Sequence, residues 1–191
     1  MTTARPLAVF AGCLLAVGLW QIAAGAWIYG KARLAQVLLS RAWVRAEKGV
    51  QARPWPWADT WPVARLEVPL HHIDLIVLEG AHGRTLAFGP GHLSSSAKAG
   101  DPGTAILTGH RDTHFRFLED VESGEELWME TPGGRRHRFE VVEARVVDSR
   151  STAISSARDE SVLVLVTCYP FDAIAPGGPL RYVVTAVKRD L

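Results

Sequence analysis

The sequence predicts a mainly β protein: a closed barrel of seven or eight strands with short helices, preceded by an N-terminal transmembrane helix. Residues 6–30 contain no charged side chain, and several stretches after residue 62 alternate polar and apolar side chains. Turn-forming Gly and Pro separate these stretches. With 191 residues, 48% of them hydrophobic, the chain can bury one core but not two large ones.

Residues 1–30 are predicted to be a membrane anchor. The run from Pro6 to Gly30 exceeds the roughly 20 apolar residues that cross a bilayer core. Trp27 and Tyr29 lie at its end, where aromatic side chains favour the membrane interface. A cleaved signal peptide is the alternative, with the small residues 23–26 as a possible cleavage site, but its apolar part would be shorter.

Residues 31–62 are predicted to form a juxtamembrane helix followed by a linker. Apolar and basic residues recur with helical spacing over residues 31–49, which fits either a continuation of the anchor helix or a helix lying on the lipid surface. The linker VQARPWPWADTWP cannot be helical because three prolines interrupt it. Its three tryptophans are expected to pack on the following domain or to lie in the membrane interface.

Residues 63–191 are predicted to form the barrel. Short runs of β-forming residues follow one another with turns between them, a pattern typical of closed β architectures. The predicted strands are Val63–Val68, Leu75–Leu78, Thr104–Thr108, Leu127–Thr131, His137–Val147, Ser161–Thr167 and Tyr182–Lys188.

Charge and cysteine content restrict the class of protein. A net charge of +1 argues against a nucleic-acid-binding protein. Residues 1–62 carry seven Lys and Arg against two acidic residues, whereas residues 63–191 carry fourteen against eighteen. The basic excess accompanies the apolar run, so membrane lipid is an expected partner of the N-terminal helix. Cys13 lies inside that run, which leaves Cys168 as a lone thiol in the barrel.

Three residues at the ends of predicted strands could carry chemistry. The strand SVLVLVT runs directly into Cys168, and TAILTG runs into His110. A cysteine nucleophile needs a thiolate, which a nearby imidazole can supply. Arg181, at the start of the last strand, could stabilise the negative charge that acyl transfer develops on a carbonyl oxygen. Taken singly, each also fits a simpler structural role: a buried thiol, a turn histidine and a solvated arginine.

In combination and in this order, the motifs resemble those of the sortases, membrane-anchored cysteine transpeptidases. The matching motifs are FGPGHL at 88–93, TGH at 108–110 followed by RDTHF, VTC at 166–168, and Arg181 thirteen positions after the cysteine. The resemblance covers residues 63–187. The anchor, the PWPWADTWP linker and the GHRDTHF loop are most similar to class GN sortases of Gram-negative proteobacteria. Val164 departs from the family pattern, which often has Thr at this position.

This resemblance implies a reaction. Cys168 would attack the carbonyl between Thr and Gly of a Leu-Pro-x-Thr-Gly-like C-terminal sorting signal on a secreted protein and form a thioacyl-enzyme. An amine acceptor, which the sequence does not identify, would then take the acyl group. His110 would serve as the acid and base, and Arg181 would contact the substrate and the oxyanion.

Further residues are expected to contact substrate. Leu165 and Thr167 would shape the groove, and Asp112 and His114 would orient His110 or touch the substrate. No metal site and no cofactor are expected. The acidic run at residues 119–126 leaves calcium binding as a less favoured alternative, because such a run is usually a solvated surface.

Two other functions and the membrane orientation stay open at the sequence level. A non-enzymatic, membrane-tethered β-barrel that binds a partner would bury Cys168. An L,D-transpeptidase would place its cysteine in a Ser-x-Gly-Cys-x-Arg context, which is absent here. The Lys and Arg that follow the apolar run would place the barrel in the cytoplasm. The resemblance instead implies an inner-membrane, single-pass protein with the catalytic domain on the periplasmic side.

Overall fold

The computed structural model describes residues 4–154, 159–173 and 177–190. The chain divides into two compact units, Met1–Val37 and Leu38–Leu191. A single helix, α1 (Ala4–Glu47), supplies all the secondary structure of the first unit and the beginning of the second.

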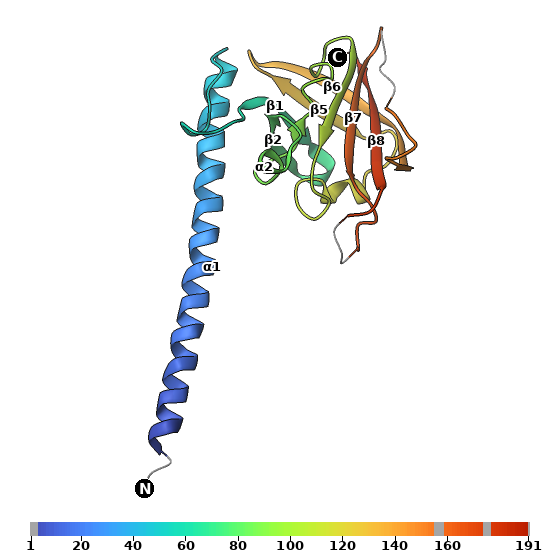
Figure 1. Cartoon of the computed structure of the whole chain (residues 1–191). Coiled ribbons are helices and arrows are strands. Elements are labelled where there is room, and N and C mark those ends of the chain that lie inside the picture. The colour runs from blue at the N-terminus through green and yellow to red at the C-terminus, as the bar shows by residue number, and fades with distance from the viewer. Residues whose placement is uncertain (1–3, 155–158, 174–176, 191) are drawn as a thin grey trace. The chain divides into compact units, whose positions relative to one another are not determined.

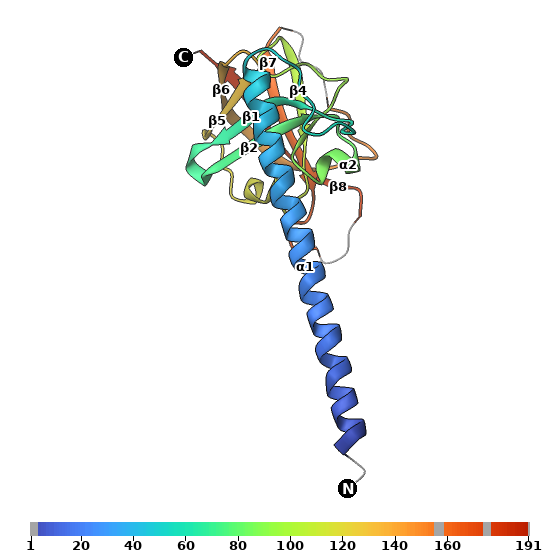
Figure 2. The same cartoon turned by 90° about the vertical axis from the view of Figure 1, so that its left-hand side faces the viewer.

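Helix α1 runs without a break through the region where the sequence left two alternatives (Figure 2). The segment 31–47 therefore continues the helix of the apolar run and is not a separate element. From Ala8 to Glu47 the helix is long and apolar enough to cross a membrane, with a mean hydropathy of 1.8 in its most apolar window. Large apolar side chains such as Leu19 and Ile22 are more than 60% exposed, which is compatible with membrane anchoring.

The second unit contains a closed barrel of eight strands, as the sequence predicted. Around the barrel the strands follow the order β1-β2-β3-β4-β7-β8-β6-β5 and return to β1. The strands are β1 (Pro62–Val68), β2 (Ile73–Glu79), β3 (Gly91–His92), β4 (Gly103–Thr108), β5 (Glu126–Thr131), β6 (Arg135–Asp148), β7 (Ser161–Cys168) and β8 (Leu180–Arg189). The sequence did not predict β3, a strand of two residues.

In the described residues, three short helices lie between strands. They are η1 (Pro69–His71), α2 (Gly83–Leu86) and η2 (Arg116–Glu119). Most neighbouring strands are antiparallel, but β2 pairs with β3 and β4 pairs with β7 in parallel. The parallel β4–β7 pair brings the carboxyl ends of two strands to the same edge, and β8 runs beside β7 on its other side (Figure 1).

Alternation along the strands fills the barrel. Leu66, Leu127, Phe139, Leu163 and Leu165 are all fully buried in one hydrophobic cluster. Burying each such side chain contributes about 1.5–3 kcal/mol. The intervening residues face outward, so two strands that share this core also share an outer surface.

The segment that leads into the barrel is also packed. Leu39, Trp43 and Ala46, on the last turns of α1, are at most 4% exposed within the second unit. In the linker, the ring of Trp55 meets that of Phe88 edge-on, with 5.0 Å between ring centroids. Two linker tryptophans therefore differ in role, because Trp57 is 82% exposed.

Candidate active site

Cys168 is the last residue of β7 and has a free, partly exposed thiol. Along β7, Leu163 and Leu165 point into the core. Alternation therefore directs Cys168 to the outer face of the barrel, together with Val164 and Val166. This position differs from the fully buried thiol that a purely binding barrel would have.

Arg181 lies directly beside Cys168. The two residues are paired across the antiparallel strands β7 and β8, so their side chains start from the same face. Nη1 of Arg181 donates to the carbonyl oxygens of Gly178 and Leu180, at 2.9 and 2.8 Å. The guanidinium thus rests on its own loop in this structure and would have to turn toward the thiol to meet an oxyanion.

His110 reaches the same edge from the other neighbour of β7. Strand β4 pairs with β7 in parallel, with Thr108 opposite Val166. The contact continues past the strand, because the Gly109 N–H donates to the Val166 carbonyl at 3.2 Å. His110 follows at once and is exposed. The topology therefore brings His110, Cys168 and Arg181 to one edge of three adjacent strands.

Gly109 is required for the chain to turn at this point. A Cβ atom at residue 109 would lie 2.8 Å from the ring of Phe115, which is itself fully buried. The Phe115 N–H donates to the His110 carbonyl at 3.0 Å and closes the loop that begins with the histidine. Glycine therefore lets the histidine loop fold back onto the end of β4.

Leu165 and Thr167 both face the inside of the barrel. Leu165 is fully buried in the core, and Thr167 is 2% exposed. The Thr167 hydroxyl donates to the Gly109 carbonyl at 2.8 Å. The part expected of both side chains in shaping the groove stays a prediction. Thr167 joins the strand of the cysteine to the residue before the histidine.

Asp112 and His114 lie in the loop that follows His110. The Asp112 carboxylate accepts a 3.3 Å contact from Arg111 Nε and is not seen to orient His110. Burial, followed by the nearby charge of His110, lowers the pKa of His114. His114 therefore favours the neutral form beside the candidate acid and base.

The structure adds residues that the sequence analysis missed. Arg111 is 5% exposed and donates to the carbonyls of Pro170 and Ala173. Arg116 donates to the carbonyl of Phe171 at 3.1 Å. In a polar loop, nothing in the sequence separates these arginines from solvated ones. Beyond Cys168, the rings of Tyr169, Phe171 and Tyr182 contact one another, and burial, then the nearby Tyr169, raises the pKa of Tyr182.

The outer face of β4, β7 and β8 offers an apolar surface that leads to Cys168. Ile106 pairs with Val164, and Val166 pairs with Val183 on the next strand. Ile106 and Val166 are partly exposed. Their partners Val164 and Val183 are each only 3% exposed.

Comparison with known proteins identifies this arrangement. A model of the sortase domain matches residues 66–189. The chain belongs to the sortase family. Sortase D of Bacillus subtilis is 34% identical over 120 residues, which cover 62% of this chain and 60% of that protein. The match therefore spans less than two thirds of the length of this curated relative.

Solved sortases share the fold. Sortase C-1 of Actinomyces oris superimposes with a TM-score of 0.61 at 27% identity. The match covers 68% of this chain and 74% of the Actinomyces oris chain. A sortase D5 transpeptidase of Clostridium perfringens superimposes with a TM-score of 0.66 at 20% identity. The match covers 83% of this chain and 99% of the Clostridium perfringens chain. Membership of this family is not consistent with the L,D-transpeptidase alternative.

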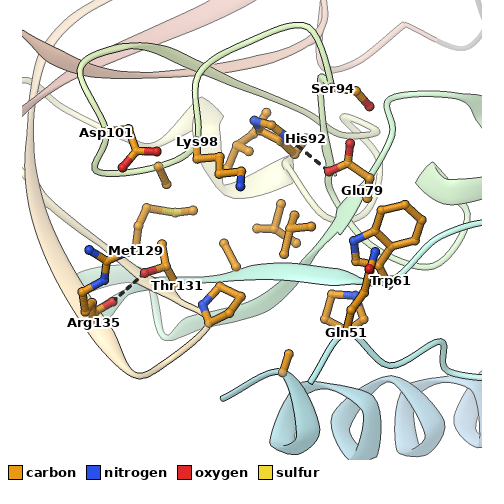
Figure 3. A pocket seen from close by; sticks show the side chains of 18 of the residues that line it. Gln51, Trp61, Glu79, His92, Ser94, Lys98, Asp101, Met129, Thr131 and Arg135 are labelled. Carbon is orange, nitrogen blue, oxygen red and sulfur yellow. Dashed lines mark hydrogen bonds and ion pairs between the residues drawn. The ribbon is translucent and has the colours of Figure 1, made fainter. Parts of the chain in front are cut away.

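A hollow of about 510 Å³ lies on this sortase unit (Figure 3). Its lining includes the apolar Leu107 and Met129 and the polar His92, Lys98 and Arg135. Cys168, His110 and Arg181 are not among its lining residues. This hollow is therefore separate from the candidate active site.

Within the described part of the chain, no group of three or more His, Cys, Asp or Glu side chains is arranged to hold a metal ion. Several members of the acidic run already have partners. Glu125 is hydrogen-bonded to His71 at 2.8 Å, and two ion pairs join Glu119 to Arg116 at 2.8 Å and Glu126 to Arg138 at 3.2 Å.

Proposed function

We propose that this sortase is a membrane-anchored cysteine transpeptidase that cleaves a Leu-Pro-x-Thr-Gly-like C-terminal sorting signal on a secreted protein and transfers the acyl group to an amine. The observation that carries the proposal is the meeting of His110, Cys168 and Arg181 at one edge of β4, β7 and β8. The catalytic roles follow from the chemistry of these three side chains.

Acylation begins when the Cys168 sulfur, having given its proton to His110, attacks the carbonyl carbon between Thr and Gly. The tetrahedral oxyanion is stabilised by Arg181, whose five N–H donors remain charged at neutral pH. The C–N bond then breaks, His110 returns the proton to the leaving Gly amine, and a thioester remains on Cys168.

Deacylation uses the same groups in reverse. The incoming amine attacks the thioester carbonyl while His110 accepts a proton from it, and the second oxyanion again faces Arg181. When the C–S bond breaks, the acyl group leaves on the amine. The Cys168 sulfur regains its proton from His110, so the enzyme ends as it began.

The same proposal includes the finer assignments. The enzyme would belong to the class GN subgroup, anchored in the inner membrane by α1 with its barrel on the extracytoplasmic side. Support comes from the linker and histidine-loop motifs and from the apolar helix of residues 8–47. Asp112 and His114 are candidates for substrate contact because they lie in the loop that begins at the exposed His110. No cofactor is required by this route.

The test is cleavage of a fluorogenic Leu-Pro-x-Thr-Gly peptide library by the full chain in detergent, beside Cys168→Ala. We expect product from the unchanged enzyme only and, by intact-mass spectrometry, an acyl adduct on Cys168. Silence from both proteins, together with a Cys168 thiol that resists a small alkylating agent in the folded state, would favour the non-enzymatic barrel. Silence with a readily alkylated Cys168 would show that the sorting signal is wrong.

A further inference from the structure

Arg111 is a buried cation that the proposed reaction does not use. Its side chain is 6% exposed, although it follows the exposed His110 directly. A guanidinium taken out of water is tolerated only where it is hydrogen-bonded or paired. The contacts that hold Arg111 in place therefore indicate what it does.

Those contacts connect the histidine loop to the segment after the cysteine. Nη1 of Arg111 donates to the Pro170 carbonyl at 2.7 Å, and Nη2 donates to the Ala173 carbonyl at 2.8 Å. From the same loop, Arg116 reaches the Phe171 carbonyl at 3.1 Å. Two arginines after His110 thus hold three carbonyls within five residues of Cys168.

The position of these contacts matters because β4 and β7 are parallel. Main-chain bonding between the two segments extends as far as the Gly109 N–H and the Val166 carbonyl. Beyond that point Arg111 connects the histidine loop to the segment that follows Cys168. A planar guanidinium can reach two carbonyls at a fixed spacing, which a single ammonium group cannot reproduce.

We propose that Arg111 is a positioning residue that sets His110 opposite Cys168 by holding the segment 170–173 against the histidine loop. The proposal rests on the transpeptidase function for its kinetic consequence but not for its structural one. It predicts that loss of the guanidinium uncouples the imidazole from the thiol while both remain in the folded barrel.

The first test measures coupling without any substrate. The rate of Cys168 alkylation by iodoacetamide is followed against pH in the full chain in detergent. The variants are Arg111→Met, Arg111→Lys and His110→Ala, with Arg84→Met as the matched loss of one cation, because Arg84 is 87% exposed in its side chain. We expect the Arg111→Met profile to move to that of His110→Ala, and the Arg84→Met profile to coincide with that of the unchanged protein.

Folding is checked by circular dichroism and thermal melting. If Arg111→Met does not fold, Arg111→Lys carries the test, because it keeps the charge and one donor position. A folded Arg111 variant whose alkylation profile coincides with that of the unchanged protein overturns the proposal. A merely structural arginine would lower the melting temperature without moving this profile.

The second test uses the peptide reaction. Because small misplacements of reacting groups cost about 100-fold in rate, Arg111→Met should lower kcat by about that factor and change KM less. If the unchanged protein cleaves no peptide but the alkylation profile still moves, the positioning role stands and the sorting signal in the proposed function is wrong. If it cleaves peptide and Arg111→Met does so at the same kcat, the positioning role fails and the proposed function stands.

Discussion

Replacing Thr167 by Val tests how the cysteine strand is held to the histidine loop. Valine keeps the shape of threonine but cannot donate the 2.8 Å hydrogen bond to the Gly109 carbonyl. Both residues are buried, so the carbonyl loses a partner that water does not readily replace. Leaving such a group unsatisfied costs about 1–3 kcal/mol. For a unit of this size, each kcal/mol lowers the melting temperature by about 2–4 °C.

The measurement is a thermal melt followed by circular dichroism, with Thr167→Ser as the matched control. Serine keeps the hydroxyl and loses only a methyl group, so its destabilisation should be clearly smaller than that of valine. We also expect Thr167→Val to lower the rate of peptide cleavage, because Gly109 precedes His110 directly. The reasoning would be refuted by a Val variant that is as stable as the unchanged protein, or by a Ser variant that is destabilised more than Val.

Three further predictions concern the same edge of the barrel and its surroundings. Gly109→Ala should destabilise the fold by about 1–3 kcal/mol, because the new methyl group meets Phe115 at 2.8 Å; adding Phe115→Leu should recover part of the loss in a double-mutant cycle of melting temperatures. Because the pKa of His114 is lowered in the folded state, the His114 imidazole of the unfolded chain takes up a proton before that of the folded chain as the pH falls below about 6.5. Acid therefore destabilises the folded state. His114→Gln should therefore lose less melting temperature than the unchanged protein between pH 7 and pH 5. Calcium should not accelerate peptide cleavage, because Glu125 is already bound to His71 at 2.8 Å; an acceleration that Glu125→Gln abolishes would contradict this.

The closed barrel could be predicted from the sequence because its strands alternate with a period of two. Strand β7 is an example: Leu163 and Leu165 fill the core, and the run ends at Cys168. Strand β3 was missed because Gly91 and His92 are too few to show any period. The N-terminal helix was predicted from its composition, but only the structure showed that it continues to Glu47.

The candidate site was predictable to a different extent. His110, Cys168 and Arg181 could be chosen because each lies where a predicted strand begins or ends and because, in combination and order, their motifs resemble those of the sortases. Arg111 could not be chosen, since its role depends on carbonyls about 60 residues away that have no sequence signature. The hydrogen bond of Thr167 likewise depends on its partner Gly109 across the parallel strands.

The two pairings of Cys168 are held by different physical means, and this difference has a consequence for catalysis. Cys168 and Arg181 belong to antiparallel neighbours, and the Tyr169 N–H and the Leu180 carbonyl close the connecting loop at 3.1 Å. The ladder itself therefore sets where the Arg181 side chain begins. His110 comes from a parallel neighbour, whose main-chain bonding to β7 extends only as far as Gly109. Around and beyond that point, the side chains of Thr167 and Arg111 connect the two segments. Perturbing them should impair proton transfer by His110 while leaving the placement of Arg181 intact, so the two halves of the site can be separated by mutation.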